Sequence, residues 1–109
     1  MKIEERRLFG LFGDPVGHSL SPYLQNEAFR LLGVNGVYLS FAVKPEELAT
    51  AVEAVRCLKF GGVNITIPHK ERIIPYLDRL ADEALLTGSV NTVVPVDGKL
   101  VGYSTDGEG

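Results

Sequence analysis

The fold begins with the stretch Leu8-Phe9-Gly10-Leu11-Phe12-Gly13-Asp14-Pro15. This mostly apolar run stops at a Gly-Asp-Pro sequence, which is typical of a buried strand that leads into a loop. From Pro22 onward, apolar residues recur at roughly helical spacing until Gly33, a residue type that commonly follows the last turn of a helix. The start of the chain therefore predicts a strand over 8–12 and a helix over 22–32.

The same alternation of strand and helix continues along the chain. Alternating or β-branched apolar residues predict further strands over 36–43, 62–67, 90–96 and 99–103. Apolar stripes at helical spacing predict further helices over 45–61, 70–77 and 78–86. The last two strands flank Asp97-Gly98, a dipeptide favoured in tight hairpin turns. We therefore expect a three-layer α/β/α sandwich whose mainly parallel sheet ends in a C-terminal antiparallel hairpin.

Composition limits the classes of function. The 109 residues are 45% hydrophobic, enough for one domain with its own core, and the net charge of -3 comes without a basic cluster. Such a charge balance argues against a nucleic-acid binder and fits a small ligand. The chain has one cysteine, Cys57, and two histidines, which argues against a disulfide or a metal site. Because no long apolar segment is present, we expect a soluble, cytoplasmic protein without membrane contacts.

Neither a dinucleotide-binding loop nor a hydrolase site can be assigned from the sequence. Gly10, Gly13 and Gly17 are spaced too widely for the dinucleotide fingerprint. His18 stands beside Ser19, but adjacent side chains of an extended segment point apart, and the nucleophile turn between glycines is missing. The chemistry must therefore lie in other polar residues.

Ser19 and Ser21 form the first of four polar groups near the expected carboxyl ends of the strands. Two residues apart in an extended segment, their hydroxyls face the same side. Ser21 precedes Pro22 and is a natural helix N-cap, a role that still lets its hydroxyl donate a hydrogen bond to a ligand. For Ser19 the sequence offers no structural role.

Asn64, Thr66 and Lys70 form the second group, in which Asn64 and Thr66 share one strand face. Lys70 would lie near the start of the helix predicted over 70–77. The helix dipole there disfavours a positive charge, which suits a group that exchanges a proton; a solvated surface lysine is the alternative. We expect the neighbouring His69 to be structural.

The last two groups are Ser89-Val90-Asn91-Thr92 and Ser104-Thr105-Asp106-Gly107. They place an amide, that of Asn91, and a carboxylate, that of Asp106, at the two ends of the hairpin. Asn and Asp beside small residues are common in turns for local reasons, so neither group alone indicates a function.

Together these segments resemble the N-terminal, substrate-binding domain of shikimate dehydrogenases. Four motifs in the family's order carry the resemblance: Gly13-Asp14-Pro15 with His18-Ser19-Leu20-Ser21-Pro22, Gly62-Val63-Asn64-Ile65-Thr66-Ile67-Pro68-His69-Lys70, Gly88-Ser89-Val90-Asn91-Thr92 and Thr105-Asp106-Gly107-Glu108-Gly109. The resemblance implies that residues 1–109 form this domain. It also implies that the family's NADP-binding Rossmann domain lies outside these residues, so that no cofactor is expected to bind here.

The resemblance assigns a role to each matching residue. Ser19 and Ser21 would bind the carboxylate of shikimate, and the ring hydroxyls would contact the side chains of Thr66, Lys70, Asn91 and Asp106. Lys70 and Asp106 would be the catalytic pair: Lys70 exchanges the proton and Asp106 orients it, while hydride passes between substrate and NADP. The family interconverts 3-dehydroshikimate and shikimate in aromatic amino acid biosynthesis. We expect this chain alone to bind substrate without turnover.

Two positions depart from the family's pattern. Ser104 stands where Asn is usual, which bears on the placement of Asp106, and Ser89 stands where Ala is common. The alternatives are a non-catalytic sensor for shikimate-like or quinate-like acids and a fragment of a quinate/shikimate dehydrogenase. The resemblance to the family implies that the Ser19 and Ser21 pair favours shikimate. A homodimer formed through an exposed face is a further hypothesis.

Overall fold

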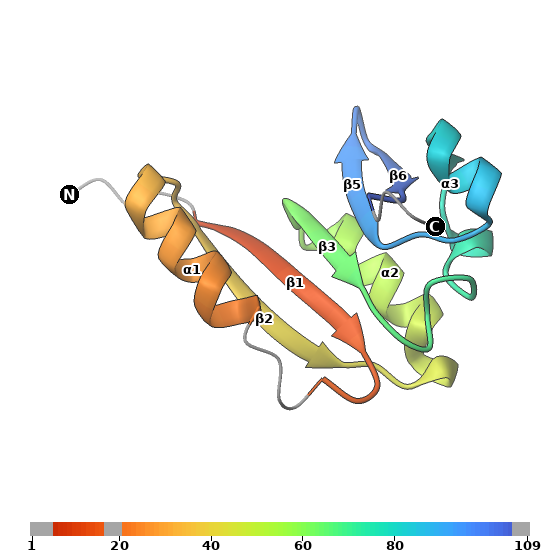
Figure 1. Cartoon of the computed structure of the whole chain (residues 1–109), viewed down its shortest axis with the longest axis horizontal. Coiled ribbons are helices and arrows are strands. Elements are labelled where there is room, and N and C mark those ends of the chain that lie inside the picture. Colours follow the sequence, from red (N-terminus) through yellow and green to blue (C-terminus); the bar gives the residue numbers. More distant parts are fainter. Residues whose placement is uncertain (1–5, 17–20, 106–109) are drawn as a thin grey trace.

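The computed structural model describes residues 6–16 and 21–105, without the side chain of Ser21 (Figure 1). Its strands are β1 (Arg7–Gly13), β2 (Gly36–Ala42), β3 (Gly62–Ile65), β4 (Arg79–Leu80), β5 (Thr92–Val96) and β6 (Lys99–Tyr103). Its α-helices are α1 (Ser21–Leu32), α2 (Leu48–Cys57) and α3 (Asp82–Thr87), and its 3-10 helices are η1 (Pro45–Glu47) and η2 (Ile74–Tyr76).

These strands form one mixed sheet in the order β2-β1-β3-β5-β6-β4. β1 pairs in parallel with both β2 and β3, and β4 pairs in parallel with β6. β5 runs antiparallel to β3 and to β6. The turn between β5 and β6 has positive φ angles at Asp97 (52°) and Gly98 (80°), as the tight hairpin turn requires. The predicted fold class and the C-terminal hairpin are confirmed.

The two larger helices cover opposite faces of the sheet (Figure 1). Phe9 of β1 packs against Phe29 of α1, with ring centroids 4.9 Å apart. Phe12 points to the other face, where it belongs to the main core cluster with Val52 and Val55 of α2. Because successive side chains of a strand alternate between faces, β1 contributes to both layers of core.

The helices predicted over 70–77 and 78–86 are wrong in extent. Residues 70–77 form turns and the short helix η2, while 78–86 is divided between β4 and α3. Pro75 lacks the N–H that a continuous α-helix would need, and the Asp78 carboxylate accepts the N–H of Leu100 on β6 at 2.7 Å. Since no α-helix begins at Lys70, the argument from a helix dipole has no basis there.

Two predicted element ends also need correction. α2 stops at Cys57 because Lys59 takes a left-handed φ of 57°, and the Phe60 N–H donates to the Val55 carbonyl at 3.1 Å. Leu58, expected on the apolar stripe, is 63% exposed. β3 stops at Ile65, so that Ile67, which the strand predicted over 62–67 included, lies beyond the strand and is 64% exposed.

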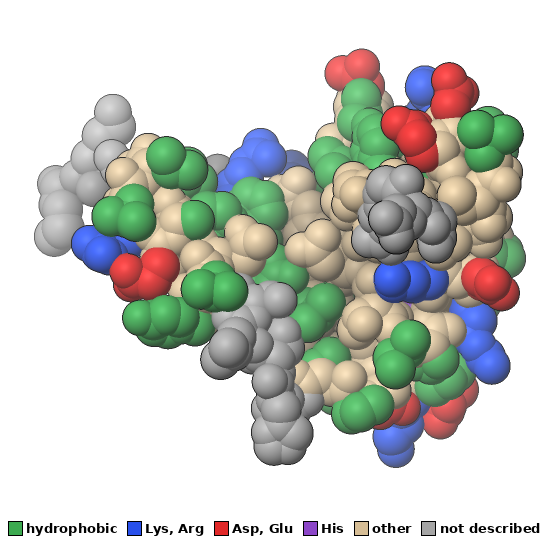
Figure 2. Space-filling model, viewed as in Figure 1, with side chains coloured by type: hydrophobic (Ala, Val, Ile, Leu, Met, Phe, Trp, Pro, Cys, Tyr) green, Lys and Arg blue, Asp and Glu red, His purple; other side chains and the backbone are tan. Residues whose placement is uncertain are grey.

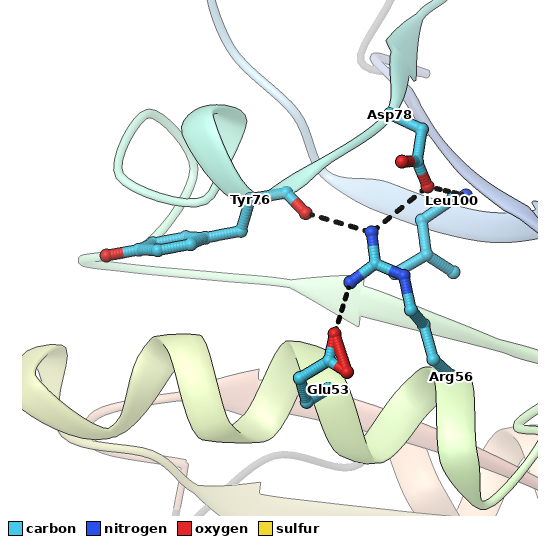
Figure 3. A network of polar contacts seen from close by, with 5 residues as sticks. All are labelled: Glu53, Arg56, Tyr76, Asp78 and Leu100. Carbon is cyan, nitrogen blue, oxygen red and sulfur yellow. Dashed lines mark hydrogen bonds and ion pairs between the residues drawn. The ribbon is translucent and has the colours of Figure 1, made fainter.

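Arg56 ties α2 to the segment before β4 (Figure 3). Its guanidinium lies 2.8 Å from a Glu53 carboxylate oxygen and 3.0 Å from the Asp78 Oδ2 atom. The Leu100 N–H, and after it Arg56, lowers the pKa of the Asp78 carboxyl below its ordinary value. A lowered carboxyl pKa means that the charged form of Asp78 favours the folded state.

Asp78 is expected to make part of the stability dependent on acid. Its contribution is fully present above the unfolded pKa of about 4 and is lost as pH falls through the lower folded pKa. Asp78→Asn should therefore destabilise the protein at pH 7, and the difference from wild type should shrink on acidification. Urea unfolding at several pH values measures this, with the exposed Asp97→Asn as the control. A difference that stays constant with pH would contradict the expectation.

Hydrophobic side chains gather over α1 on the face seen in Figure 2. The exposed large apolar residues of this helix are Tyr23, Leu24, Leu31 and Leu32. Within the ranges that the structure describes, no helix is long and apolar enough to cross a membrane.

Candidate functional site

Four chain segments meet at one edge of the sheet, where β1 and β3 end, β5 begins and β6 ends. The Asp14 N–H donates to the Ile67 carbonyl at 3.0 Å, which joins the segments that follow β1 and β3. The Asn91 carbonyl accepts the Ile65 N–H at 2.8 Å, and the Asn91 N–H donates to the Tyr103 carbonyl at 2.9 Å. The segments that follow β1 and β3, precede β5 and follow β6 are therefore hydrogen-bonded to one another through their backbones.

Thr66 follows β3 directly and is held against β1. Its N–H donates to the Phe12 carbonyl at 2.9 Å. A Cβ atom at Gly13 would lie only 2.3 Å from the Thr66 methyl carbon, so a side chain at position 13 would displace Thr66. The Gly in the Gly-Asp-Pro sequence is thus required for the close approach of the two segments.

Lys70 is brought beside Asn91 by the turn that follows Thr66. The His69 N–H donates to the Thr66 carbonyl at 3.0 Å, and the Lys70 carbonyl accepts the Val90 N–H at 2.8 Å. The Lys70 side chain is half-buried and helps to line a cavity of about 290 Å³ that also includes Ser89. The backbone of Lys70 is therefore held at the edge where Thr66 and Asn91 lie.

His69 is completely buried, as expected for a structural residue. Its Nε2 atom lies 2.6 Å from the Val43 carbonyl oxygen, which can only accept, so Nε2 carries the proton. The other ring nitrogen, Nδ1, has no hydrogen-bond partner in the described part of the chain. The imidazole ties the turn that carries Lys70 to the end of β2.

The Asn91 side chain has a fixed orientation. Its Oδ1 atom accepts from the Thr92 hydroxyl at 3.0 Å, the Thr105 N–H at 3.1 Å and the Thr105 hydroxyl at 3.2 Å. An amide oxygen that receives three donors fixes which end of the amide faces Thr92 and Thr105. The orientation of the Asn91 side chain is therefore set by residues of this edge.

The structure adds Tyr38 to the polar residues predicted from the sequence and joins it to Asn64. Both line a cavity of about 250 Å³ between α1 and the sheet, together with Thr92. The Tyr38 hydroxyl donates to the Asn64 Oδ1 atom at 2.8 Å, and burial raises the pKa of this phenol. The sequence placed Asn64 on the same strand face as Thr66, but it gave Tyr38 only the role of a strand residue.

The six predicted site residues fall into two sets. The backbone brings Thr66, Lys70 and Asn91 to one edge of the sheet. Ser19 and Asp106 lie outside the described residues, and for Ser21 the structure describes only that α1 begins there, one residue before the predicted start. Among the residues described, no group of three His, Cys, Asp or Glu side chains could hold a metal ion.

The β1–α1 connection does not fit a dinucleotide. Gly10 and Gly13 both belong to β1 itself, and the Thr66 side chain fills the space beside Gly13. The glycine spacing of a pyrophosphate-binding turn is therefore missing from this strand-to-helix connection.

Polar residues beyond the carboxyl ends of parallel strands are typical of α/β domains that bind small molecules. Residues 11–93 match the family model of the shikimate dehydrogenase substrate binding domain. The chain therefore belongs to the shikimate dehydrogenase family.

Individual relatives agree with this family. The shikimate dehydrogenase (NADP(+)) of Geobacter metallireducens is 54% identical over 103 residues, which are 94% of this chain and 36% of the relative. The Listeria monocytogenes shikimate 5-dehydrogenase, solved with shikimate and NAD, has a TM-score of 0.91 at 47% identity over 94% of this chain and 36% of that one. The 5-ketofructose reductase of a Gluconobacter strain has a TM-score of 0.92 at 32% identity, covering 95% and 38%. The chain thus spans under two fifths of each of these relatives.

Proposed function

We propose that this chain is the substrate-binding part of an NADP-dependent shikimate dehydrogenase and carries its proton-transfer groups. The observation that supports this most is the meeting of Thr66, Lys70 and Asn91 at one sheet edge in a member of this family. Lys70 supplies a cation that can exchange a proton with a substrate oxygen, and Asn91 supplies a fixed amide donor. Thr66 adds a hydroxyl that can donate or accept.

Ser19, Ser21 and Asp106 complete the proposed site. The two serines would bind the substrate carboxylate, and Asp106 would orient Lys70. Since Asn91 Oδ1 accepts from the N–H and the hydroxyl of Thr105, the residue before Asp106 is already held at this edge of the sheet.

Isothermal titration with shikimate tests the proposal on the chain itself. We expect binding, weak because part of the site would come from the nucleotide-binding domain, and no consumption of NADPH when 3-dehydroshikimate is added. A Thr66→Val variant should bind less tightly than wild type, with Thr50→Val on the exposed side of α2 as the control. Absence of shikimate binding at millimolar concentration would overturn the proposal, and turnover by the chain alone would overturn the expected inactivity.

The same titration separates the alternative functions. Quinate bound as tightly as shikimate would favour a quinate/shikimate dehydrogenase. A preference for 5-ketofructose would favour the activity that the Gluconobacter relative is named for. A sensor would bind shikimate in the chain's native full-length form without catalysing its oxidation.

We also propose that copies of the chain self-associate. The exposed leucines of α1, Leu24, Leu31 and Leu32, are between 61% and 77% exposed and support this. Sedimentation equilibrium should show a dimer at high concentration that Leu31→Asp weakens. A strict monomer across the concentration range would contradict it.

A further inference from the structure

A row of side-chain hydrogen bonds crosses the sheet from α1 to the segment after β6. It starts at Asn26 of α1, whose amide binds both backbone polar groups of Tyr38: the oxygen accepts the Tyr38 N–H at 2.7 Å, and the nitrogen donates to the Tyr38 carbonyl at 2.9 Å. Tyr38 is 4% exposed, so its side chain is also held by packing. Tyr38 is therefore anchored to α1 independently of any ligand.

The row has one direction. The Tyr38 hydroxyl donates to Asn64 Oδ1 at 2.8 Å, and the Asn64 amide nitrogen donates to the Thr92 hydroxyl oxygen at 3.2 Å. With that oxygen accepting, the Thr92 hydroxyl donates its own proton to Asn91 Oδ1 at 3.0 Å. Each side chain thus donates a hydrogen bond to the next, and Asn91 Oδ1 accepts the last of these bonds.

We propose that Tyr38 is a positioning residue: its hydroxyl restrains the Asn64 amide and, through Thr92, the orientation in which the Asn91 side chain meets the substrate. The inference deepens the proposed function and rests on it for the identity of the ligand. Two side chains, those of Asn64 and Thr92, lie between Tyr38 and Asn91 in the row, and Tyr38 acts through them.

Loss of the phenol hydroxyl removes the constraint on the Asn64 amide. The two ends of an amide have nearly the same shape, so Asn64 can then rotate and offer its oxygen to Thr92. The Thr92 hydroxyl donates to Asn64 in that arrangement and no longer to Asn91. The two Thr105 donors alone then hold Asn91 Oδ1, and the NH₂ group loses part of its fixed direction.

Tyr38→Phe tests the inference because it removes only the hydroxyl. We expect shikimate affinity to fall about 3- to 10-fold, the range of one hydrogen bond, with an unchanged far-UV spectrum. Tyr76→Phe is the matched control, since Tyr76 is 41% exposed and its ring points away from its neighbours in Figure 3. Equal affinity of Tyr38→Phe and wild type would overturn the inference.

A double-mutant cycle separates positioning from a general structural effect. If Tyr38 acts through Asn91, Tyr38→Phe should cost little further affinity in an Asn91→Ala background, so the two losses should not add. Additive losses would overturn the inference while leaving shikimate binding, and hence the proposed function, intact.

A measurement without ligand keeps the inference testable even where no binding is found. In two-dimensional ¹H–¹⁵N spectra, the side-chain amide protons of Asn64 and Asn91 should both shift in Tyr38→Phe and stay unchanged in Tyr76→Phe. An unshifted Asn91 amide would overturn the inference. Failure of wild type to bind shikimate would instead overturn the proposed function.

Discussion

Lys70→Ala is expected to lower kcat about 100- to 10,000-fold in a chimera that joins this chain to the remaining part of the Geobacter metallireducens relative. Interconversion of a ketone and an alcohol requires a proton at the substrate oxygen, and Lys70 is the proposed proton carrier, its backbone held at the edge where Thr66 and Asn91 meet. Positioned acid–base groups contribute rate factors of this size. Consumption of NADPH with 3-dehydroshikimate measures the effect.

Lys99→Ala is the matched control for Lys70→Ala. Lys99 begins β6 beside the hairpin turn, at the far end of the strand from the site, and its side chain is exposed. Its removal should leave kcat and KM within about twofold, because surface substitutions away from special features have small effects. If Lys70→Ala behaves like Lys99→Ala in an active chimera, Lys70 is not the proton carrier.

His69→Ala is expected to lower the free energy of unfolding by about 3 kcal/mol. The change removes a completely buried ring and leaves the Val43 carbonyl without the donor that now lies 2.6 Å away. For a domain of this size the loss corresponds to a melting temperature lower by about 10–20 °C. Urea unfolding and thermal melts of the isolated chain measure it.

His69→Gln is the corresponding control. A glutamine amide can still donate to the Val43 carbonyl, so this variant should lose less than half as much stability as His69→Ala. Equal losses would show that packing and not the hydrogen bond determines the role of His69. Wild-type stability in His69→Ala would mean that the turn carrying Lys70 does not depend on the imidazole.

The first half of the fold follows from sequence periodicity, while the segment over 70–86 does not. β1, α1 and β2 lie within about one residue of their predicted ends because each is bounded by Gly, Pro or a sharp change of period. Between 70 and 86 the apolar spacing is also helical, but the Asp78 carboxylate pairs with the Leu100 N–H on β6. That contact joins residues far apart in sequence, and local spacing contains no signal for it.

Part of the candidate site could likewise be predicted from the sequence, and part could not. Thr66, Lys70 and Asn91 could be predicted because their motifs follow or precede strands that end at one edge of the sheet. Tyr38 could not, since its role depends on Asn26 and Asn64, which reach it from α1 and β3. A tyrosine within an apolar alternation is typical of strand packing, and only the folded arrangement places its hydroxyl in a hydrogen-bonded row.

Tyr38 also gives the protein an optical signal of its own. The chain contains no tryptophan, so its near-ultraviolet emission comes from four tyrosines. Tyr38 is 4% exposed, whereas Tyr23 and Tyr76 are 68% and 41% exposed and are open to soluble quenchers. Emission that survives iodide quenching therefore comes from Tyr38 and from the half-buried Tyr103 at the end of β6, and it reports on the interior of the protein without any attached label.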